Sequence, residues 1–549
     1  LVNGYLQAEP IKGLALKANL GVDRRYDKNK SYVPNTTVAG AAKGGIANIL
    51  QRDNIDYLME LTANYTKDFG NHSLTALVGY SYQQFNQESV YAGNEDFSTD
   101  GFLYNNLQAG AGTKPYVNSS ARKSALGSYF ARANYSYLGK YLLTVTVRAD
   151  GESNFHPDYR WGYFPSVSAG WRFSDEEFMK PLSSILSNGK LRASYGQTGN
   201  SNIGNYMTDS YGVVSGWVFG NDGYMGTAIT KRGNKKLTWE TTSEFNIGLD
   251  LGFFDNRISL SMEYYNRIIS DLLVSNKSLP AYNEINTIAA NIGKTQGRGF
   301  ELTLSTVNIM NKDWTWSTDF TFYTFKDNWY ERDPNWKPAA YESKKDPIRS
   351  YYSYVSDGLL QVGEKAPAWQ PTLVPGQIKL KNLYDTGTSP NVLDQYDKVN
   401  LGSQDPKCTL GLNNTLRYKN LNFNIYFYGE IGRLRGASYY DAWIVGLGNS
   451  LTNVSQQSLH SYTNANQNTT VPNLIESAYD FGDYYHKKIN YLRCRNITLG
   501  YTIPVSKSIA NVSNPFVFTN WNGVDPETDT GNFSYPNVTS FSFGIDISF

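Results

Sequence analysis

The feature that most constrains this chain is a two-residue alternation of apolar and polar side chains. From Ser540 to Phe549 the odd-numbered positions are apolar and the even-numbered positions are small or polar. Successive side chains of a β-strand point to opposite faces, so this segment has one apolar and one polar face. The same alternation recurs from Tyr141 to Asp150, where only Leu142 breaks it. The sequence therefore predicts an all-β protein whose strands have one apolar face.

The alternating segments are joined in turn by short turns and long irregular segments. We count about 17 strand candidates of around 10 residues each. Short turns occur at Gly139-Lys140 and Lys419-Asn420, whereas the irregular segment from about 328 to 405 is long. A strand of about 10–12 residues, tilted by about 35–45°, spans roughly the thickness of a bilayer core. The pattern predicts a transmembrane antiparallel β-barrel with short periplasmic turns and long extracellular loops. The alternative is a large soluble β protein, whose strands are typically nearer to about 5–6 residues.

The composition agrees with a barrel and excludes other classes. Aromatic residues make up 15% of the 549 residues, and charged residues make up 18%, below the roughly 25% of soluble domains. No run approaches the roughly 20 apolar residues of a membrane-spanning helix. The net charge of +1 gives no indication of a nucleic-acid partner. Two cysteines, Cys408 and Cys494, are predicted to be isolated thiols rather than a disulfide framework.

The sequence contains no arrangement typical of an enzyme. The four histidines lack metal-ligand spacing, and His156 is predicted to have a structural or loop role. Glycine-rich pieces such as Ala109–Gly112 lack the Lys-Ser/Thr of a phosphate-binding loop. No catalytic residue, cofactor or metal is predicted.

Several short motifs occur in a fixed order over the last three-quarters of the chain. They are Asp150–Phe155, Arg160–Ser166, Ser194–Asn200, Leu237–Thr242, Tyr491–Arg493, Asn496–Tyr501 and Gly523–Glu527. Together and in this order, these motifs resemble the SusC/RagA family of TonB-dependent outer-membrane transporters. The localisation implied is the Gram-negative outer membrane, of the type found in Bacteroidetes.

The resemblance implies a larger assembly than this chain. Family members are barrels of about 22 strands with an internal plug, so residues 1–549 would be the C-terminal part of the barrel, with the plug and first strands absent from this chain. The implied activity is import of oligosaccharides or peptides. The implied partners are a SusD-like surface lipoprotein lid, TonB-ExbB-ExbD acting through a plug and TonB-box segment, and outer-membrane lipid, with dimers of transporter–lipoprotein pairs. A passive porin-like barrel and a soluble β-rich binding protein are the alternatives.

One region departs from the family pattern. Many relatives carry an acidic loop suited to calcium before the strand that starts here at Lys407. In this chain the corresponding region, Lys381–Gly387, has nearby acids only at Asp385, Asp394 and Asp397. Calcium loops need several oxygen ligands at alternating positions. We therefore do not transfer a metal site to this sequence.

Aromatic residues of the predicted long loops are the candidates for binding a substrate or a partner. They are Trp217, Tyr224, Trp329, Tyr330, Trp336, Tyr351, Tyr352 and Trp443. Such rings can stack on sugars or anchor a protein interface, or they can form a small core within the loops themselves. Polar residues predicted to line the lumen, where they would hydrogen-bond to a plug or to water, are Arg132, Asn134, Arg148, Asp150 and Glu263.

Overall fold

The computed structural model describes most of the chain. It describes residues 1–549 except 113–114, 220–221, 281, 284, 385–390, 437–455, 476–478, 504–505, 522–524, 529–534 and 548–549. The chain divides into two compact units. The first comprises Leu1–Trp171, Ala193–Phe245 and Ile269–Gly293, and the second comprises Arg172–Arg192, Asn246–Ile268 and Lys294–Phe549.

Seventeen strands belong to one sheet, and each of them overlaps one strand candidate of the sequence. The all-β prediction is therefore confirmed. The strands are β1 (Val2–Ile11), β2 (Leu14–Val33), β3 (Ile46–Phe69), β4 (His72–Glu95), β5 (Tyr116–Tyr137), β6 (Tyr141–Glu152), β7 (Trp161–Trp171), β8 (Leu186–Asn200), β11 (Glu240–Phe253), β12 (Ile258–Ser270), β15 (Lys294–Met310), β16 (Trp314–Glu331), β21 (Cys408–Tyr418), β22 (Leu421–Gly436), β23 (His486–Ile503), β24 (Ser506–Thr519) and β25 (Ser540–Ile547).

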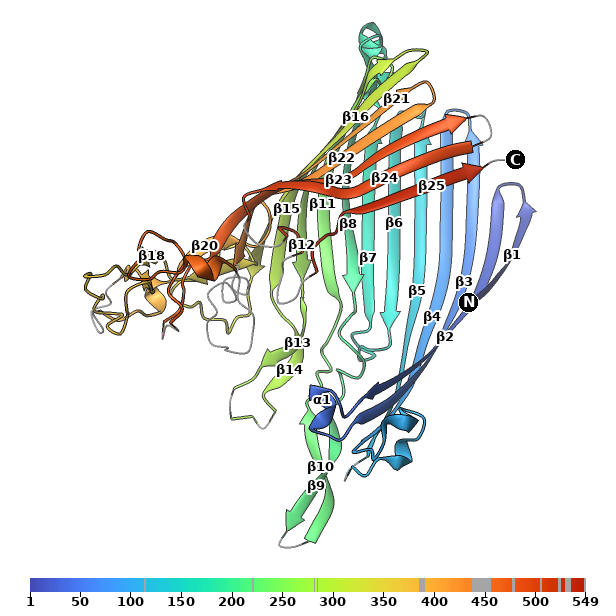
Figure 1. The fold of residues 1–549 in the computed structure, drawn as a ribbon. Coiled ribbons are helices and arrows are strands. Elements are labelled where there is room, and N and C mark those ends of the chain that lie inside the picture. Colours follow the sequence, from blue (N-terminus) through green and yellow to red (C-terminus); the bar gives the residue numbers. More distant parts are fainter. Residues whose placement is uncertain are drawn as a thin grey trace. The chain divides into compact units, whose positions relative to one another are not determined.

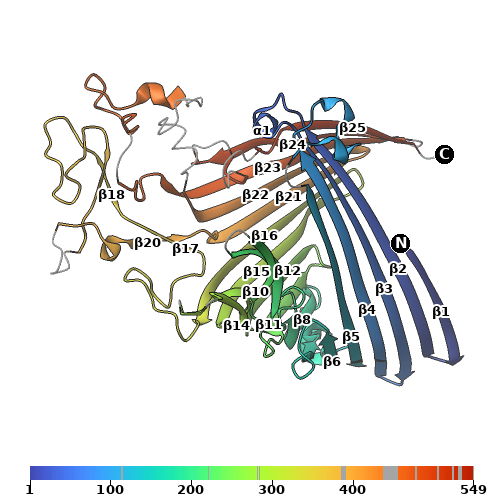
Figure 2. The same ribbon diagram turned by 90° about the horizontal axis from the view of Figure 1, so that it is seen from below.

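In the first unit, β1 to β7 pair in sequence order, each antiparallel to the next, and β2 to β5 lie side by side in both views (Figures 1 and 2). Tight turns join β1 to β2, β3 to β4 and β5 to β6. Gly13, Gly70 and Gly139 occupy these turns with positive φ, a conformation that glycine adopts without steric cost. Longer connections join the opposite strand ends, as the sequence predicted.

In the second unit, β15, β16 and β21 to β25 also pair in order. β21 and β22 meet at a tight turn where Lys419 has a positive φ. Long segments follow β16, β22 and β24. The same alternation of tight turns and long connections therefore holds in this unit.

Many strands are longer than the sequence predicted. β3 and β4 have 24 residues each, and their paired extensions enter the segment from about 86 to 122 that was predicted to be irregular. The alternation of apolar and polar residues fades there, but the backbone ladder continues from Asp53↔Glu88 to Ile46↔Glu95. Backbone hydrogen bonds need no apolar face, so a ladder can extend beyond the region where hydropathy alternates.

The apolar face of the strands is the exposed one. On β6, Tyr141, Leu143, Val145 and Val147 are 41–49% exposed, whereas Asp150 on the opposite face is 7% exposed. On β25, Phe541 and Phe543 are more than 70% exposed. Ordered apolar rows open to the surroundings match a hydrocarbon environment rather than water. No helix in the described part of the chain is long and apolar enough to span a membrane.

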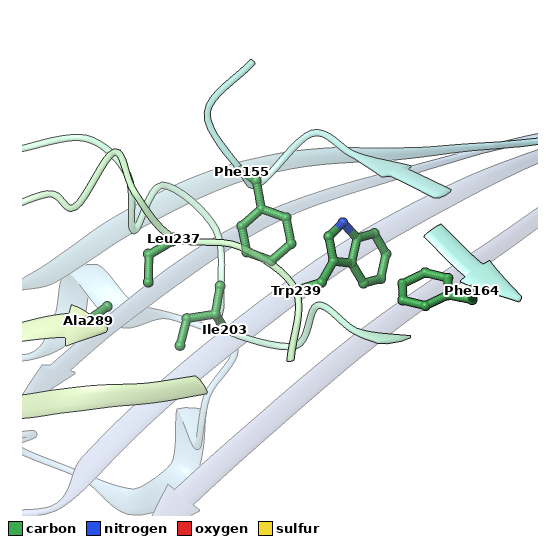
Figure 3. Packing of buried hydrophobic residues seen from close by; sticks show 6 residues of the cluster. All are labelled: Phe155, Phe164, Ile203, Leu237, Trp239 and Ala289. Carbon is green, nitrogen blue, oxygen red and sulfur yellow. The ribbon is translucent and has the colours of Figure 1, made fainter. Parts of the chain in front are cut away.

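The core of the first unit lies at the strand ends opposite the tight turns. Its buried residues are Phe155, Phe164, Ile203, Leu237, Trp239 and Ala289. The indole of Trp239 lies between the rings of Phe155 and Phe164, at centroid distances of 5.7 and 5.4 Å (Figure 3). Trp239 Nε1 donates to the Arg160 carbonyl at 2.8 Å. Three of the sequence motifs therefore meet in one cluster around this indole.

Smaller elements occur in the connections and were not predicted. Their strands are β9 (Tyr211–Phe219), β10 (Asp222–Lys231), β13 (Leu273–Ser278), β14 (Thr287–Asn291), β17 (Ser350–Ser353), β18 (Ser356–Leu359), β19 (Ile378–Leu380) and β20 (Val399–Ser403). The helical elements are α1 (Val38–Ala41) and the 3₁₀ turns Asp100–Phe102, Leu107–Ala109, Phe173–Asp175, Glu177–Leu182, Gln395–Asp397 and Gln456–His460.

Candidate functional site

The polar strand faces carry linked side chains, as expected for residues that line a lumen. Between β5 and β6, Arg132 Nε donates to Thr146 Oγ1 at 3.2 Å. Thr144 Oγ1 donates to Asn134 Oδ1 at 3.0 Å on the same face. In the second unit, Glu263 pairs with Arg192 at 2.6 Å. These contacts satisfy the polar groups within the strand face itself.

The loop aromatics of the second unit are partly engaged with a cation. β16 extends to Glu331, so Trp329 and Tyr330 lie at the strand end rather than in the loop. The guanidinium carbon of Arg332 lies 5.3 Å from the Trp329 ring centroid and 3.8 Å from that of Trp336. Cation–π contacts of this kind order both rings. Tyr330 differs, because it is 61% exposed.

Tyr351 and Tyr352 on β17 point to different partners. Tyr352 Oη donates to Asp346 Oδ2 at 2.6 Å, and burial together with this bond raises the pKa of Tyr352. The Tyr351 ring lies 4.3 Å from that of His486. Loop aromatics therefore contribute to packing within the second unit. A separate loop core, formed by Leu359, Ile378, Leu380 and Tyr462, lies in the same unit.

The remaining aromatic candidates are placed only in part. Trp217 on β9 and Tyr224 on β10 are direct register partners in a hairpin. Trp443 lies outside the described residues. Of the eight candidates, Tyr330 has the most exposed side chain among those whose exposure is described.

The region compared with a calcium loop is organised by a buried carboxylate. Asp397 is fully buried. Its Oδ1 accepts the backbone N–H groups of Leu383 and Tyr384 at 2.7 and 3.0 Å, and its Oδ2 accepts that of Asp394 at 2.9 Å. Backbone donors thus surround the oxygens, while Asp385 lies outside the described residues. The described residues contain no group of three or more His, Cys, Asp or Glu side chains suited to a metal ion.

The second unit contains a cluster of buried charged side chains. Arg493 Nη2 donates to Asp525 Oδ2 at 2.8 Å, and its Nε donates to Glu527 Oε1 at 2.9 Å. The side chains of Arg493 and Asp525 are 3% and 5% exposed. Arg495 reaches Glu527 Oε2 at 2.9 Å. Arg435 Nη1 donates to the Pro526 carbonyl at 2.7 Å. We call these three arginines with Asp525–Glu527 the arginine clamp.

The acidic segment also supports itself. Asp525 Oδ1 accepts the backbone N–H of Glu527 at 2.8 Å and that of Thr528 at 3.2 Å, and its Oδ2 accepts that of Asn537 at 3.2 Å. Burial acts to raise the pKa of Asp525, but these donors and Arg493 outweigh it, so the pKa lies below its ordinary value. The clamp therefore holds the connection between β24 and β25 against β22 and β23.

The lowered pKa of Asp525 predicts an acid-sensitive clamp. A carboxyl group whose pKa falls on folding contributes stability above its unfolded value of about 3.9, and that stability is lost as the pH falls further. We expect Asp525→Asn to reduce the free energy of unfolding by about 2 kcal/mol at pH 7. The difference from wild type should shrink as the pH falls below about 4. Unfolding in detergent between pH 7 and pH 3 measures this, and a difference independent of pH would contradict it.

Sequence reasoning singled out Tyr491–Arg493 and Gly523–Glu527 as motifs but did not join them. Arg495 has no register partner in either the β22–β23 or the β23–β24 ladder. It is therefore a bulge residue, and bulges redirect side chains. No sequence pattern predicted this bulge. The acidic motif itself was visible, but its arginine partners lie more than 30 residues away along the chain.

Comparison with known proteins places this fold in a family. Residues 5–355 match the family model described as TonB dependent receptor-like, beta-barrel. The chain is 31% identical over its whole length to TonB-dependent receptor P3 of Formosa agariphila, of which it covers 58%. It is 29% identical over 90% of its length to TonB-dependent receptor SusC of Bacteroides thetaiotaomicron, of which it covers 50%. The chain thus spans about half the length of the curated relatives it matches.

Among solved structures, one of the RagAB peptide transporter matches the whole chain with a TM-score of 0.84 and 25% identity, and 61% of that chain is covered. A structure of the RagAB peptide importer in the "closed-closed" state gives the same TM-score at 26% identity. These matches confirm the barrel fold, of which the chain forms a part. This chain belongs to the TonB-dependent receptor β-barrel family, as an outer-membrane barrel of SusC/RagA type.

Proposed function

We propose that this chain is the C-terminal part of the barrel of an active importer that moves oligosaccharides or peptides across the outer membrane. A plug elsewhere in the full protein would close the barrel, and energy would arrive from TonB-ExbB-ExbD through that plug. A SusD-like surface lipoprotein would act as a lid, in dimers of transporter–lipoprotein pairs. The chain would have no enzymatic role.

The observation that carries the proposal is the match of the entire chain to a transporter described as a peptide importer. The polar side chains linked across β5 and β6 agree with a lumen that passes polar cargo. The loop core of the second unit agrees with a structured outer surface on which a lid could rest.

The test uses the full-length protein in its native outer membrane. Gentle detergent extraction followed by peptide mass spectrometry should recover plug peptides and a SusD-like lipoprotein together with this chain. Uptake of fluorescent oligosaccharides and peptides should stop when TonB is deleted. Uptake that persists without TonB, or a preparation lacking plug peptides, would favour a passive porin. A chain that is folded and monomeric in plain buffer would contradict the barrel altogether.

Tyr330 is our candidate anchor for the lipoprotein lid, because 61% of this loop-side ring is exposed. Truncating a central aromatic anchor typically costs about 1–2 kcal/mol or more. We expect Tyr330→Ala to weaken lipoprotein binding about tenfold, measured as a dissociation constant in detergent. The matched control is Tyr163→Ala, which removes a 68% exposed ring from the apolar face of β7. If the Tyr330→Ala and Tyr163→Ala variants bind the lipoprotein with equal affinity, Tyr330 is not an anchor of the interface.

A further inference from the structure

The first unit contains a polar cavity that the proposed function does not yet use. Its volume is about 480 Å³, within the roughly 300–1,000 Å³ of small-molecule sites. It lies beside the middle of β5 and the ends of β6 and β8, and it is bordered by the loop that follows β8. The lining residues are Ser124, Leu126, Asp150, Asn154, Gly199, Asn200, Ser201, Asn202, Gly204, Asn205 and Trp239.

The loop that borders this cavity is anchored by a residue buried in the core of the first unit. Ile203 is 4% exposed and packs in the core cluster around Trp239 (Figure 3). The backbone N–H of Asn202 donates to Asn200 Oδ1 at 3.0 Å. Gly204 has a φ of +88°, which an L side chain rarely adopts. The buried Ile203 thus anchors the loop, while its neighbour Asn202 remains exposed beside the cavity.

Asp150 borders the cavity as a buried, paired carboxylate that is 7% exposed. Arg148 Nε lies 2.8 Å from both carboxylate oxygens, but this nitrogen carries a single proton, which it donates to Oδ2. Arg148 Nη2 donates to Ser128 Oγ at 2.9 Å. Asp150 Oδ1 is shielded from the cavity and is neutralised by the adjacent Arg148 guanidinium.

Two amide side chains add both donors and acceptors. Among the described residues, the only hydrogen bonds of Asn154 and Asn202 to another side chain use their backbone N–H groups. Their side-chain amides are therefore available to a ligand. The Trp239 indole adds an aromatic wall, fixed by its bond to the Arg160 carbonyl. Amides, a carboxylate and an aromatic ring around one cavity form a mixed polar and apolar lining.

We propose that this cavity binds one ring of a neutral, hydroxyl-rich ligand, namely a sugar unit of an uncharged oligosaccharide. A sugar hydroxyl group can donate to the side-chain oxygen of Asn154 or Asn202 and can accept from the side-chain nitrogen of either residue. An anionic ligand is disfavoured, because the described lining contains the carboxylate of Asp150 and no Lys or Arg side chain. A peptide backbone binds most effectively by hydrogen bonding to a free strand edge. Both edges of β5 and of β6 are already paired with neighbouring strands, so a peptide is disfavoured here.

This inference rests on the proposed import function, because it names the class of cargo.

The test uses the full-length protein, purified in detergent with its co-purifying chains. Calorimetry measures binding of maltohexaose, cellohexaose and xylohexaose, with an oligogalacturonide and an uncharged hexapeptide as probes of the other classes. The first variant, Asn154→Ala/Asn202→Ala, removes the two available amides. The second, Ser124→Phe, fills the cavity without touching them. The control, Asn105→Ala, makes the same chemical change at an exposed asparagine in another loop.

We expect at least one neutral hexasaccharide to bind. Affinity should fall about tenfold in the double variant, since two hydrogen bonds are lost, fall further in Ser124→Phe and stay unchanged in Asn105→Ala. The inference is overturned if no neutral hexasaccharide binds, if both cavity variants bind it as wild type does, or if only the anionic or peptide probe depends on these residues. Uptake is scored separately. Cavity-dependent binding without TonB-dependent uptake would refute the import function alone, whereas uptake with cavity-independent binding would refute this inference alone.

Discussion

Replacing Arg493 with methionine is expected to release the connection between β24 and β25 from the strand face. Arg493 is the only residue of the arginine clamp that binds both Asp525 and Glu527 in the described structure. Removing one partner of a buried ion pair leaves an uncompensated charge and costs about 3–5 kcal/mol. Methionine keeps most of the side-chain length, so the loss reports the charge and hydrogen bonds rather than a cavity. Cleavage between residues 520 and 539 by protease added to intact cells should rise about a hundredfold or more.

The matched control is Arg24→Met. Arg24 likewise donates two hydrogen bonds to carboxylate oxygens, both of Asp53, at 3.0 and 2.6 Å, but its side chain is 63% exposed. Exposed pairs contribute only about 0.2–1 kcal/mol. The control should therefore leave protease sensitivity and unfolding nearly unchanged. If Arg493→Met is no more sensitive than Arg24→Met, the clamp does not hold this segment.

Replacing Trp239 with alanine is expected to have a comparable effect in the first unit. Trp239 is 6% exposed and contacts both Phe155 and Phe164. Truncating a buried aromatic residue to alanine costs about 3–5 kcal/mol, because transfer free energy is lost and a cavity remains. Urea-induced unfolding of the full-length protein in detergent measures this loss.

Trp239→Phe separates packing from hydrogen bonding. Phenylalanine retains an aromatic ring but removes the 2.8 Å hydrogen bond to the Arg160 carbonyl, which still accepts the Glu152 backbone N–H at 3.2 Å. The expected cost is about 1–2 kcal/mol, clearly smaller than that of alanine. Equal losses in the two variants would mean that the hydrogen bond, rather than the packing, holds this cluster together.

Short-range regularities of the sequence were sufficient to predict the strands and their faces. Alternation from Tyr141 to Asp150 predicted which side chains of β6 share a face, because side-chain direction along a strand depends only on residue parity. Turn residues such as Gly139 marked the tight strand ends because they accept positive φ. Strand ends away from the tight turns were misjudged, since β3 and β4 continue as a paired ladder after the hydropathy pattern fades.

The contacts of the candidate functional residues could not be predicted from the sequence. Trp329 and Trp336 were named as candidates for binding a substrate or a partner or for forming a small loop core, and both rings contact Arg332. Nothing in the local sequence indicates which of several loop arginines a ring will meet. Whether the eight loop aromatics bind a substrate or a partner remains a prediction, with Tyr330 as its most direct test.

By itself, the sequence determined the all-β class, the alternation of strand faces and, through ordered motifs, the family. These properties depend on residue parity and on motif order, both of which can be determined directly from the amino-acid sequence. Only the tertiary structure decided that Asp525 and Glu527 meet Arg493, that Trp239 meets Phe155, and that Asp150 shares a cavity with Asn202. Such contacts depend on strand register, on a bulge at Arg495 and on the return path of long loops. Each of these is set by packing between segments that are distant in sequence, so no local pattern encodes it.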